Sequence, residues 1–427
     1  MLTRRSLLAA SAALSATAAL PVPTPAANRS TQAANPNTND WPWWRGPNHN
    51  GIAHDPQTPP VTWNDSLNIV WKTPVPGRSH GSPSVIGNRV LLAVADHERN
   101  LQSLLCLDRN SGKPLWETTL HQDGLNVKGN EKASMASASP ACHEKRIFIN
   151  FLNGDSVFMH ALDLDGKPLW KTRLSAYVNH QGFGSSPLLH QDLVIGVSDN
   201  KGGGAIVAMS QQTGEVIWKR DRPAKPNYPS PVVLNAAGRE QLILTGCDLV
   251  TSLNPQTGAT LWEAPGATTE CVTTSVTDGQ HVFTSGGYPK NHISAVLADG
   301  SGKLAWENNS RTYVPSMIVH QNSLFAVLDA GVAVCWDSTT GQELWKARLG
   351  GTFSSSLVLA NQNIYAANEE GTTFVYEASR EKFRLLATNK LGDSVFSSPA
   401  ICGGRIYQRI ATSENGRRQE YAVCVGS

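Results

Sequence analysis

The chain has 427 residues, of which 40% are apolar and only 16% charged, and it contains 12 Trp, 36 Gly and 25 Pro. This composition excludes a disordered chain, and its Gly and Pro content disfavours a mainly helical one, so we expect an all-β fold. The 36 Lys and Arg nearly balance the 34 Asp and Glu, and no basic tract occurs, so nucleic acid is not expected as a partner.

The N-terminal segment predicts export. A twin arginine at Arg4 and Arg5 precedes an uncharged Ala/Leu-rich run that ends at Leu20, and a Pro/Ala stretch follows at 21–27. We interpret residues 1–27 as a twin-arginine signal, cleaved after Ala18, Ala19 or Ala27. No later segment approaches ~18 consecutive apolar residues, so we expect no transmembrane segment and a periplasmic or secreted location.

Residues 28–60 are rich in Asn, Pro and Thr. We expect 28–39 to be a linker. Residues 40–60 contain Trp41, Trp43, Trp44 and Arg45 and predict an irregular N-terminal arm that packs on the remainder of the chain through these side chains.

An internal repeat organises the remainder. Six tryptophans each follow a glycine by four residues, and an Asp, Asn or Ser precedes each glycine by three or four residues. This spacing is typical of a hairpin loop in which the polar side chain caps the turn and glycine takes a positive φ. The pairs are Gly112 and Trp116, Gly166 and Trp170, Gly214 and Trp218, Gly258 and Trp262, Gly302 and Trp306, and Gly341 and Trp345.

A second signature marks where each unit begins. Eight polar openings, mostly Ser-Pro or Ser-Ser, precede short apolar runs and leave room for four strands per unit. They lie at Ser82, Ser139, Ser186, Ser230, Thr274, Ser316, Ser355 and Ser398. The tryptophans are 54, 48, 44, 44 and 39 residues apart, which fits the ~40–50-residue repeat of a four-stranded propeller blade.

The eighth unit begins at Ser398, but the chain ends at Ser427 without the repeated tryptophan. The segment 68–72 supplies one at Trp71, so we expect it to complete the last blade and close the ring. The prediction is one eight-bladed β-propeller over 61–427, as a monomer. The seventh unit departs from the pattern at 380–386. We expect the repeated tryptophans to pack between blades as structural residues: Trp71, Trp116, Trp170, Trp218, Trp262, Trp306 and Trp345.

The arm sequence at 41–51 and the repeated Asp-x-x-Ser/Thr-Gly-x-x-x-Trp units resemble the bacterial β-propeller repeat proteins related to binders of pyrroloquinoline quinone (PQQ), in particular the secreted planctomycete type. The resemblance covers residues 41–427. It implies relatives as different as quinoprotein dehydrogenases and a propeller lipoprotein of outer-membrane assembly, and fold analogy does not choose between them.

PQQ is the cofactor that this resemblance suggests. Quinoprotein dehydrogenases hold it with a disulfide between adjacent cysteines, a calcium bound by Glu and Asn, and an Asp base. This chain has no Cys-Cys pair, and no Glu and Asn set stands at matching positions. The histidines show no metal-binding spacing, and Asp163-Leu-Asp165-Gly166 is interpreted as a turn. We therefore predict no metal site and no recognisable catalytic motif.

The most promising site is the mouth of the central channel, where the residues just ahead of the openings should converge. Aromatic rings, two histidines and one carboxylate there suit a small polar ligand, and an aromatic plug with solvated histidines is the alternative. The candidates are His80, His180, Tyr228, Glu270 and Tyr313, with Met135, Gln181, Phe183, Cys271, Phe353 and Phe396 nearby. Lys290 and Asn291, in a Gly-rich stretch, either reach over the same face or belong to a solvated loop.

Seven cysteines are an odd number for an oxidising compartment, so at least one is unpaired within the chain. We expect most to be small buried strand residues. Cys247 with Cys271, and Cys402 with Cys424, are the candidate disulfides.

The function predicted is therefore a binding or scaffold module with a ligand or partner at the channel mouth. The alternatives are a periplasmic PQQ-dependent or other redox enzyme, and an interaction module of envelope assembly that uses exposed sheet edges.

Overall fold

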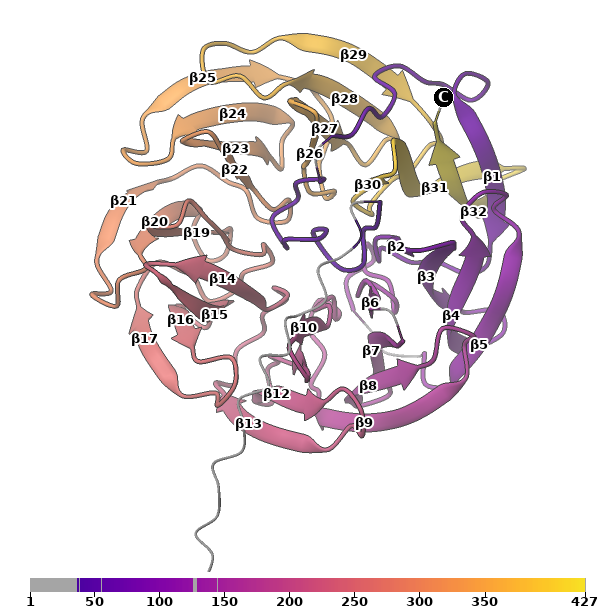
Figure 1. The fold of residues 1–427 in the computed structure, drawn as a ribbon, viewed down its shortest axis with the longest axis horizontal. Coiled ribbons are helices and arrows are strands. Elements are labelled where there is room, and N and C mark those ends of the chain that lie inside the picture. The colour runs from indigo at the N-terminus through magenta and orange to yellow at the C-terminus, as the bar shows by residue number, and fades with distance from the viewer. Residues whose placement is uncertain (1–36, 38, 55, 126–128, 144, 427) are drawn as a thin grey trace, which may run out of the picture. The chain divides into compact units, whose positions relative to one another are not determined.

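The structure, a computed structural model, describes residues 37, 39–54, 56–125, 129–143 and 145–426. This part contains 32 strands in eight four-stranded antiparallel sheets, and no helix long and apolar enough to cross a membrane occurs in it. The sheets stand as eight blades around a central axis, as Figure 1 shows, so the predicted all-β eight-bladed propeller is confirmed. The predicted signal at 1–27 and most of the linker lie outside the described residues.

The first four blades follow the chain in order. Blade 1 contains β2 (Ser84–Ile86), β3 (Arg89–Asp96), β4 (Leu101–Asp108) and β5 (Pro114–Gln122). Blade 2 contains β6 (Ala141–Cys142), β7 (Ile147–Asn153), β8 (Ser156–Leu162) and β9 (Pro168–Ala176). Blade 3 contains β10 (Leu188–His190), β11 (Leu193–Val197), β12 (Gly204–Ser210) and β13 (Val216–Arg222). Blade 4 contains β14 (Val232–Ala236), β15 (Arg239–Gly246), β16 (Leu249–Leu253) and β17 (Thr260–Ala264).

The other four blades complete the ring. Blade 5 contains β18 (Val276–Thr277), β19 (His281–Gly286), β20 (His292–Leu297) and β21 (Leu304–Asn308). Blade 6 contains β22 (Ile318–His320), β23 (Ser323–Leu328), β24 (Val332–Asp337) and β25 (Glu343–Arg348). Blade 7 contains β26 (Val358–Ala360), β27 (Asn363–Ala367), β28 (Thr372–Glu377) and β29 (Leu385–Lys390). Blade 8 contains β30 (Ala400–Cys402), β31 (Arg405–Glu414), β32 (Arg417–Val425) and, from the N-terminal side, β1 (Ile69–Val75).

Closure of the ring depends on β1, which pairs antiparallel with β32 and places Trp71 opposite Cys424. The inner strands β2 and β30 also contact each other, so the first and last blades are neighbours. The predicted completion of the last blade by 68–72 is therefore present, and the strand extends to Val75. A strand from one end of the chain thus holds the other end in place.

The middle strands of each blade are apolar on both faces because the neighbouring blades cover both, as in the fully buried stretch Val90–Asp96 of β3. The outermost strands alternate between exposed and half-buried residues. In every blade the register of this strand shifts by one residue just before the repeated tryptophan position, which leaves a bulged residue. These bulged residues are Val70, Leu115, Leu169, Ile217, Leu261, Ala305, Leu344 and Leu386.

The repeated tryptophans link each blade to the turn of the next. Trp71 lies under Gly112 and its indole N–H donates to the Arg109 carbonyl at 2.9 Å. A Cβ at Gly112 would lie 2.6 Å from the Trp71 ring, and the residue has a φ of 70°, so this position requires glycine for two separate reasons. The same contact joins Trp116 to Gly166, Trp170 to Gly214, Trp218 to Gly258 and Trp306 to Gly341.

Trp262 departs from this arrangement. Its indole N–H donates to Gln241 Oε1 at 2.6 Å within its own blade, and Gly302 of the next turn packs against Ala264 instead. Trp345 keeps the hydrogen bond to the next turn, at the Ser379 carbonyl 2.8 Å away, although no glycine stands there. The seventh unit, which lacks the tryptophan, places Ala387 at the equivalent strand position opposite Val375.

The eight polar openings form what we call the serine belt, a nearly continuous ring of hydrogen bonds around the axis. At seven of the eight openings the backbone N–H donates to the hydroxyl of the next blade's opening at 2.8–3.1 Å. The order of donation is Ser82, Ser139, Ser186 and Ser230, then Thr274, Ser316, Ser356, Ser398 and back to Ser82. At the remaining position, Thr274 Oγ1 accepts the indole N–H of Trp44 at 2.8 Å.

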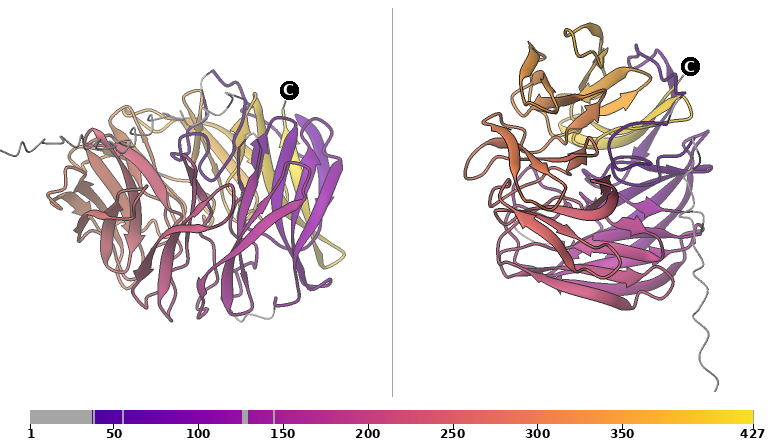
Figure 2. Two further views of the ribbon diagram at one scale, coloured as in Figure 1. Left: turned by 60° about the horizontal axis from the view of Figure 1, so that its bottom comes forward. Right: turned by 60° about the vertical axis from the view of Figure 1, so that its left-hand side comes forward.

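The N-terminal arm crosses the centre of the ring over one face (Figures 1 and 2). Trp41 forms a β-bridge with Val85, and Ile52 forms one with Leu359, so the arm is tied to blades 1 and 7. Arg45 of the arm is buried and donates to the Leu357 carbonyl at 2.8 Å and to the Met317 carbonyl. Burial lowers the pKa of Arg45 to about 9. The arm therefore closes one end of the central channel.

All seven cysteines lie in the described part of the chain and are buried as free thiols. Neither candidate disulfide, Cys247 with Cys271 or Cys402 with Cys424, is formed in the structure. Five of the seven lie in strands. Cys247 lies in the turn between β15 and β16 of blade 4, and Cys271 lies in the segment that leads into β18 of blade 5. Burial raises the pKa of these thiols, which fits small core residues better than reactive ones.

Candidate ligand chamber

The centre of the ring holds a cavity of about 360 Å³, which we call the chamber. Trp44 of the arm and the hydroxyls of the serine belt form one end of it. Aromatic side chains from several blades form its wall, and a segment from between blades 1 and 2 lies at its other end. The lining residues of that wall include His80, Phe183, Tyr228, Tyr313 and Phe396.

The segment 129–137, which we call the mouth loop, is held from three directions. Arg78 donates to the Glu131 and Lys132 carbonyls at 3.2 and 3.1 Å. Asn130 Nδ2 donates to Gln181 Oε1 at 2.9 Å, and Lys132 Nζ lies 2.8 Å from Glu369 Oε2 of blade 7. Because these contacts come from different sides of the ring, the mouth loop spans the opening of the chamber.

Glu270 is the buried carboxylate of this region, with a side chain only 8% exposed. Its Oε2 accepts the hydroxyl of Tyr313 at 3.3 Å, and its Oε1 lies 3.3 Å from His180 Nε2. A β-bridge between Glu270 and Tyr288 fixes its backbone. Burial, and next the charge of Glu270, raises the pKa of Tyr228 and of Tyr313, so both phenols stay neutral.

His80 lies on the other side of the chamber and stacks on Phe396 with ring centroids 4.3 Å apart. Its Nε2 is buried and has no hydrogen-bond partner among the residues that the structure describes. Burial first, and then the charges of Arg78, Arg418 and Arg409, lower the pKa of His80 to about 3. The ring is therefore neutral at physiological pH and offers an uncharged edge to the chamber.

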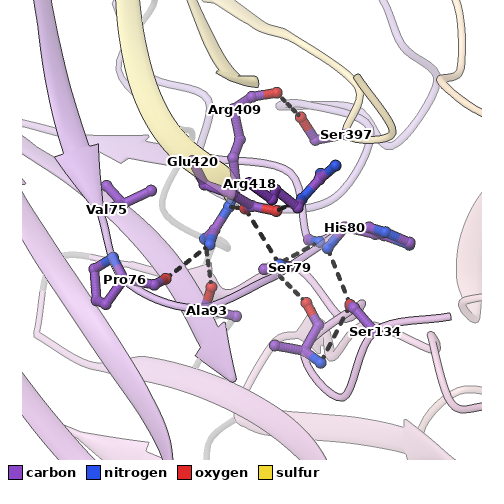
Figure 3. Close-up of polar contacts among 12 residues, drawn as sticks. Val75, Pro76, Ser79, His80, Ala93, Ser134, Ser397, Arg409, Arg418 and Glu420 are labelled. Carbon is purple, nitrogen blue, oxygen red and sulfur yellow. Dashed lines mark hydrogen bonds and ion pairs between the residues drawn. The ribbon is translucent and has the colours of Figure 1, made fainter. Parts of the chain in front are cut away.

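Behind His80 lies a buried charge cluster, shown in Figure 3. Arg409 and Glu420, each 2% exposed at the side chain, form an ion pair, and Arg418 Nε donates to Glu420 Oε1 at 2.9 Å. Arg409 also donates to the Ala93 carbonyl at 2.9 Å, which joins blade 8 to blade 1. The backbone N–H of Ser79, next to His80, donates to Glu420 Oε2 at 3.3 Å.

The structure thus brings most of the candidate residues to one place. His80, Tyr228 and Tyr313 line the chamber, together with Gln181, Phe183 and Phe396, while Glu270 and His180 lie behind this wall. Lys290 and Asn291 are exposed and do not line the chamber, as the solvated-loop interpretation expects. Phe353 and Cys271 are core residues at 1% and 0% exposure, and Met135 packs against the core between blades 1 and 2.

Sequence reasoning missed the mouth loop and the role of Trp44. The spacing of 54 residues between Trp116 and Trp170 is the longest in the repeat and was the available signal for an insertion there. The arm tryptophans were interpreted as packing residues only, whereas Trp44 also faces the chamber. Nothing in the local sequence indicated the cluster of Arg409, Arg418 and Glu420, because its members meet only through pairing of distant strands.

The PQQ and calcium implied by the resemblance do not fit this chamber. In the described residues no three His, Cys, Asp or Glu side chains are placed to hold a metal ion. Glu270 is not among the residues that line the chamber and lies behind its wall, bonded to Tyr313 and close to His180. The seven thiols include no adjacent pair. We therefore derive no chemistry through this cofactor.

An eight-bladed propeller with a chamber on its axis defines the class of protein. The family described as "Outer membrane protein assembly factor BamB" matches residues 100–347 and 289–407, which together cover most of the chain. The chain belongs to this family of PQQ-like β-propeller repeat proteins.

The chain is similar to two proteins whose names differ in kind. The chain is 26% identical to "Outer membrane protein assembly factor BamB" of Burkholderia pseudomallei over 384 residues, which cover 84% of this chain and 90% of that protein. It is 25% identical to "Polyvinylalcohol dehydrogenase" of a Sphingopyxis species over 216 residues, which cover 47% of this chain but only 31% of that protein.

Solved structures support the fold. The crystal structure of BamB from Moraxella catarrhalis superposes with a TM-score of 0.58 at 13% identity and covers 83% of this chain and 99% of that one. A quinohemoprotein alcohol dehydrogenase from Comamonas testosteroni superposes with a TM-score of 0.66, also at 13% identity, and covers 92% of this chain and 82% of that one. BamB and an alcohol dehydrogenase thus share this ring fold.

Proposed function

We propose that the protein is an exported envelope protein that binds a small ligand in the central chamber, with the propeller as a rigid scaffold. The observation that carries this proposal is the chamber itself. It measures about 360 Å³, lies within the size range of small-molecule sites, and is lined by aromatic rings and a few polar groups. The closed arm face and the spanned mouth make it a compartment rather than an open channel.

The unpartnered polar atoms around the chamber support a ligand. Within the described part of the chain, His80 Nε2 is buried without a partner, and the Tyr228 hydroxyl, though close to the Gln181 backbone, makes no hydrogen bond of ordinary geometry. Buried polar groups left without partners cost about 1–3 kcal/mol each. A bound molecule or ordered water that completes their hydrogen bonds removes this cost, so both atoms mark positions where a ligand gains affinity.

The experiment is to fill the chamber. In Val272→Trp the new indole occupies space at a half-buried lining position, while Val178→Trp adds the same group at a position that is 52% exposed and does not line the chamber. Native mass spectrometry and a thermal-shift ligand screen should detect a ligand with the wild type and with Val178→Trp but not with Val272→Trp. Equal binding by all three proteins would show that the chamber is not the site.

A second function, as a partner in envelope assembly, is favoured by the likeness to the assembly factor across 90% of its length. The exposed bulges supply a surface for it, because Leu115, Leu169 and Ile217 are 50%, 43% and 55% exposed on neighbouring outer strands. Crosslinking in intact cells should trap a stable complex that Leu115→Lys with Leu169→Lys removes. A complex that tolerates both changes would place the contact elsewhere.

A further inference from the structure

Two opposite walls of the chamber carry charges of opposite sign. Glu270 precedes β18, at the junction of blades 4 and 5, whereas the cluster behind His80 lies at the junction of blades 8 and 1. In a ring of eight blades these junctions are four blades apart in either direction. The two groups of charge therefore face each other across the axis.

The negative wall consists of Glu270 behind two tyrosines that line the chamber. Its partners are the neutral hydroxyl of Tyr313 and His180, and among the described residues no Lys or Arg forms an ion pair with it. A buried carboxylate that no Lys or Arg neutralises attracts positive charge. Tyr228 and Tyr313 add aromatic rings, and rings beside a carboxylate suit an ammonium group.

The positive wall has more guanidinium groups than carboxylates. Arg409 and Arg418 share the single carboxylate of Glu420 (Figure 3). The terminal nitrogens of Arg78 donate to backbone carbonyls of the mouth loop. Three cations and one anion leave a surplus of positive charge behind His80. The charges of all three arginines reach the His80 ring, which itself lines the chamber.

We call the negative and positive walls the two poles of the chamber. Between them, the described lining residues carry no charge apart from Lys132, which is paired with Glu369. The serine hydroxyls there accept a backbone N–H, which leaves each hydroxyl proton free to donate to a ligand; they are Ser82, Ser186, Ser230, Ser356 and Ser398. Because the lining between the two poles is neutral, the poles determine which charged ligand is selected and how it is oriented.

We propose that the chamber binds a zwitterion of dipeptide type, with its ammonium toward Glu270 and the two tyrosines and its carboxylate toward the arginine surplus beside His80. The proposal rests on the proposed function, since it names the ligand class for that same chamber. Because the poles lie on opposite sides, the two charges of the ligand are separated by more than one saturated carbon, unlike those of a free α-amino acid.

The test uses three probes with the same side chains: alanyl-alanine, its N-acetyl derivative and its C-terminal amide. Isothermal titration calorimetry should show that the dipeptide binds and that each derivative, which lacks one charge, binds at least tenfold more weakly. Free alanine, with both charges close together, should also bind at least tenfold more weakly. Equal affinity for the dipeptide and either derivative would overturn the zwitterion.

Variants assign the two poles separately. Glu270→Gln should weaken the dipeptide three- to tenfold without changing the affinity of the N-acetyl derivative, which carries no ammonium. Arg418→Gln should weaken the dipeptide without changing the amide, which carries no carboxylate. Glu377→Gln and Arg384→Gln, an exposed ion pair of blade 7, are the matched controls and should leave all affinities unchanged. Equal loss for every probe in a pole variant contradicts the assignment.

The two proposals fail in different ways. If the chamber-filling Val272→Trp abolishes binding of some other compound while alanyl-alanine does not bind at millimolar concentration, the chamber is a ligand site and the zwitterion is wrong. If alanyl-alanine binds with the expected charge dependence but Val272→Trp leaves that binding intact, the ligand class stands for another site and the chamber assignment is wrong. Melting temperatures of all variants identify any that do not fold.

Discussion

The two ends of the chamber are closed by segments of very different construction. The arm face is closed by backbone bridges at Trp41 and Ile52 and by the buried Arg45, which is 2% exposed. At the mouth face, residues 130–132 are held mainly by side-chain hydrogen bonds and by the ion pair of Lys132, a side chain that is 63% exposed. Residues 135 and 136 of the same loop instead bond to Gln102, Ser79 and Gly81 at the edge of the core. Water competes with the contacts of 130–132 but not with those of the arm, so the arm belongs to the folded core. If the chamber binds a ligand as proposed, we expect the ligand to enter past the outer part of the mouth loop.

The largest expected effect comes from the arm. Arg45→Met removes the donors for the Leu357, Met317 and Asn50 carbonyls, which a buried charged side chain now satisfies. Each orphaned group costs about 1–3 kcal/mol, so the free energy of unfolding should fall by about 3–5 kcal/mol. Urea unfolding measures this free energy. Arg78→Met, which removes the contacts of Arg78 with the mouth loop, is the comparison. Similar losses in both variants would remove the distinction between the two faces.

Low pH should destabilise the arm through His49 and the chamber wall through His80. Burial, the largest cause in each case, lowers the pKa of His49 in the arm to about 4 and that of His80 to about 3. A depressed histidine contributes stability that is complete above its unfolded pKa of about 6.5 and is lost as the pH falls toward the folded value, at up to about 1.4 kcal/mol per pH unit.

Unfolding free energies measured between pH 7 and 5 should therefore decrease, and less steeply in His49→Gln and in His80→Gln. This window lies above the titration of most carboxylates, which keeps their contribution small. An unchanged slope in either variant would mean that the corresponding ring is already open to protonation in the folded protein.

Two serines only two residues apart compare the belt with the mouth loop. Ser139 is 1% exposed and its hydroxyl accepts the Ser82 N–H at 2.9 Å, whereas half-buried Ser137 bonds within the mouth loop to Ser134. Ser139→Ala orphans a buried N–H and should cost about 1–2 kcal/mol. Ser137→Ala should cost only a few tenths, because solvent replaces its partner. Denaturant unfolding measures the loss of unfolding free energy in both variants. Equal losses would contradict a buried serine belt.

The sequence was sufficient to predict the ring but not what closes it. Blade count, the turn glycines and the completion of the last blade by Trp71 follow from local chemistry that repeats along the chain. His80, Tyr228 and Tyr313 could be placed at the axis because a propeller brings equivalent positions of its blades together. Trp44, Lys132 and the Arg409 cluster carry no repeat, and their partners are up to 333 residues away, as in the bond from Arg409 to Pro76. Periodicity therefore predicts the ring of blades, whereas the N-terminal arm and the mouth loop that close the chamber are seen only in the three-dimensional packing.

The smallest effect on stability, and the sharpest test of the mouth, concerns the ion pair of Lys132 with Glu369. An exposed pair contributes less than about 1 kcal/mol, so Lys132→Ala should leave the unfolding free energy nearly unchanged. It should nevertheless free the end of the mouth loop that reaches blade 7, because the remaining bonds of that loop lead to blades 1 and 3. Hydrogen exchange should then accelerate in peptides covering 129–137 and stay constant in those covering 41–54. Glu369→Gln, which keeps the acceptor for Ser354 but loses the charge, should give a smaller increase. Unchanged exchange in the mouth loop, or acceleration in the arm as well, would mean that the two faces open as one unit.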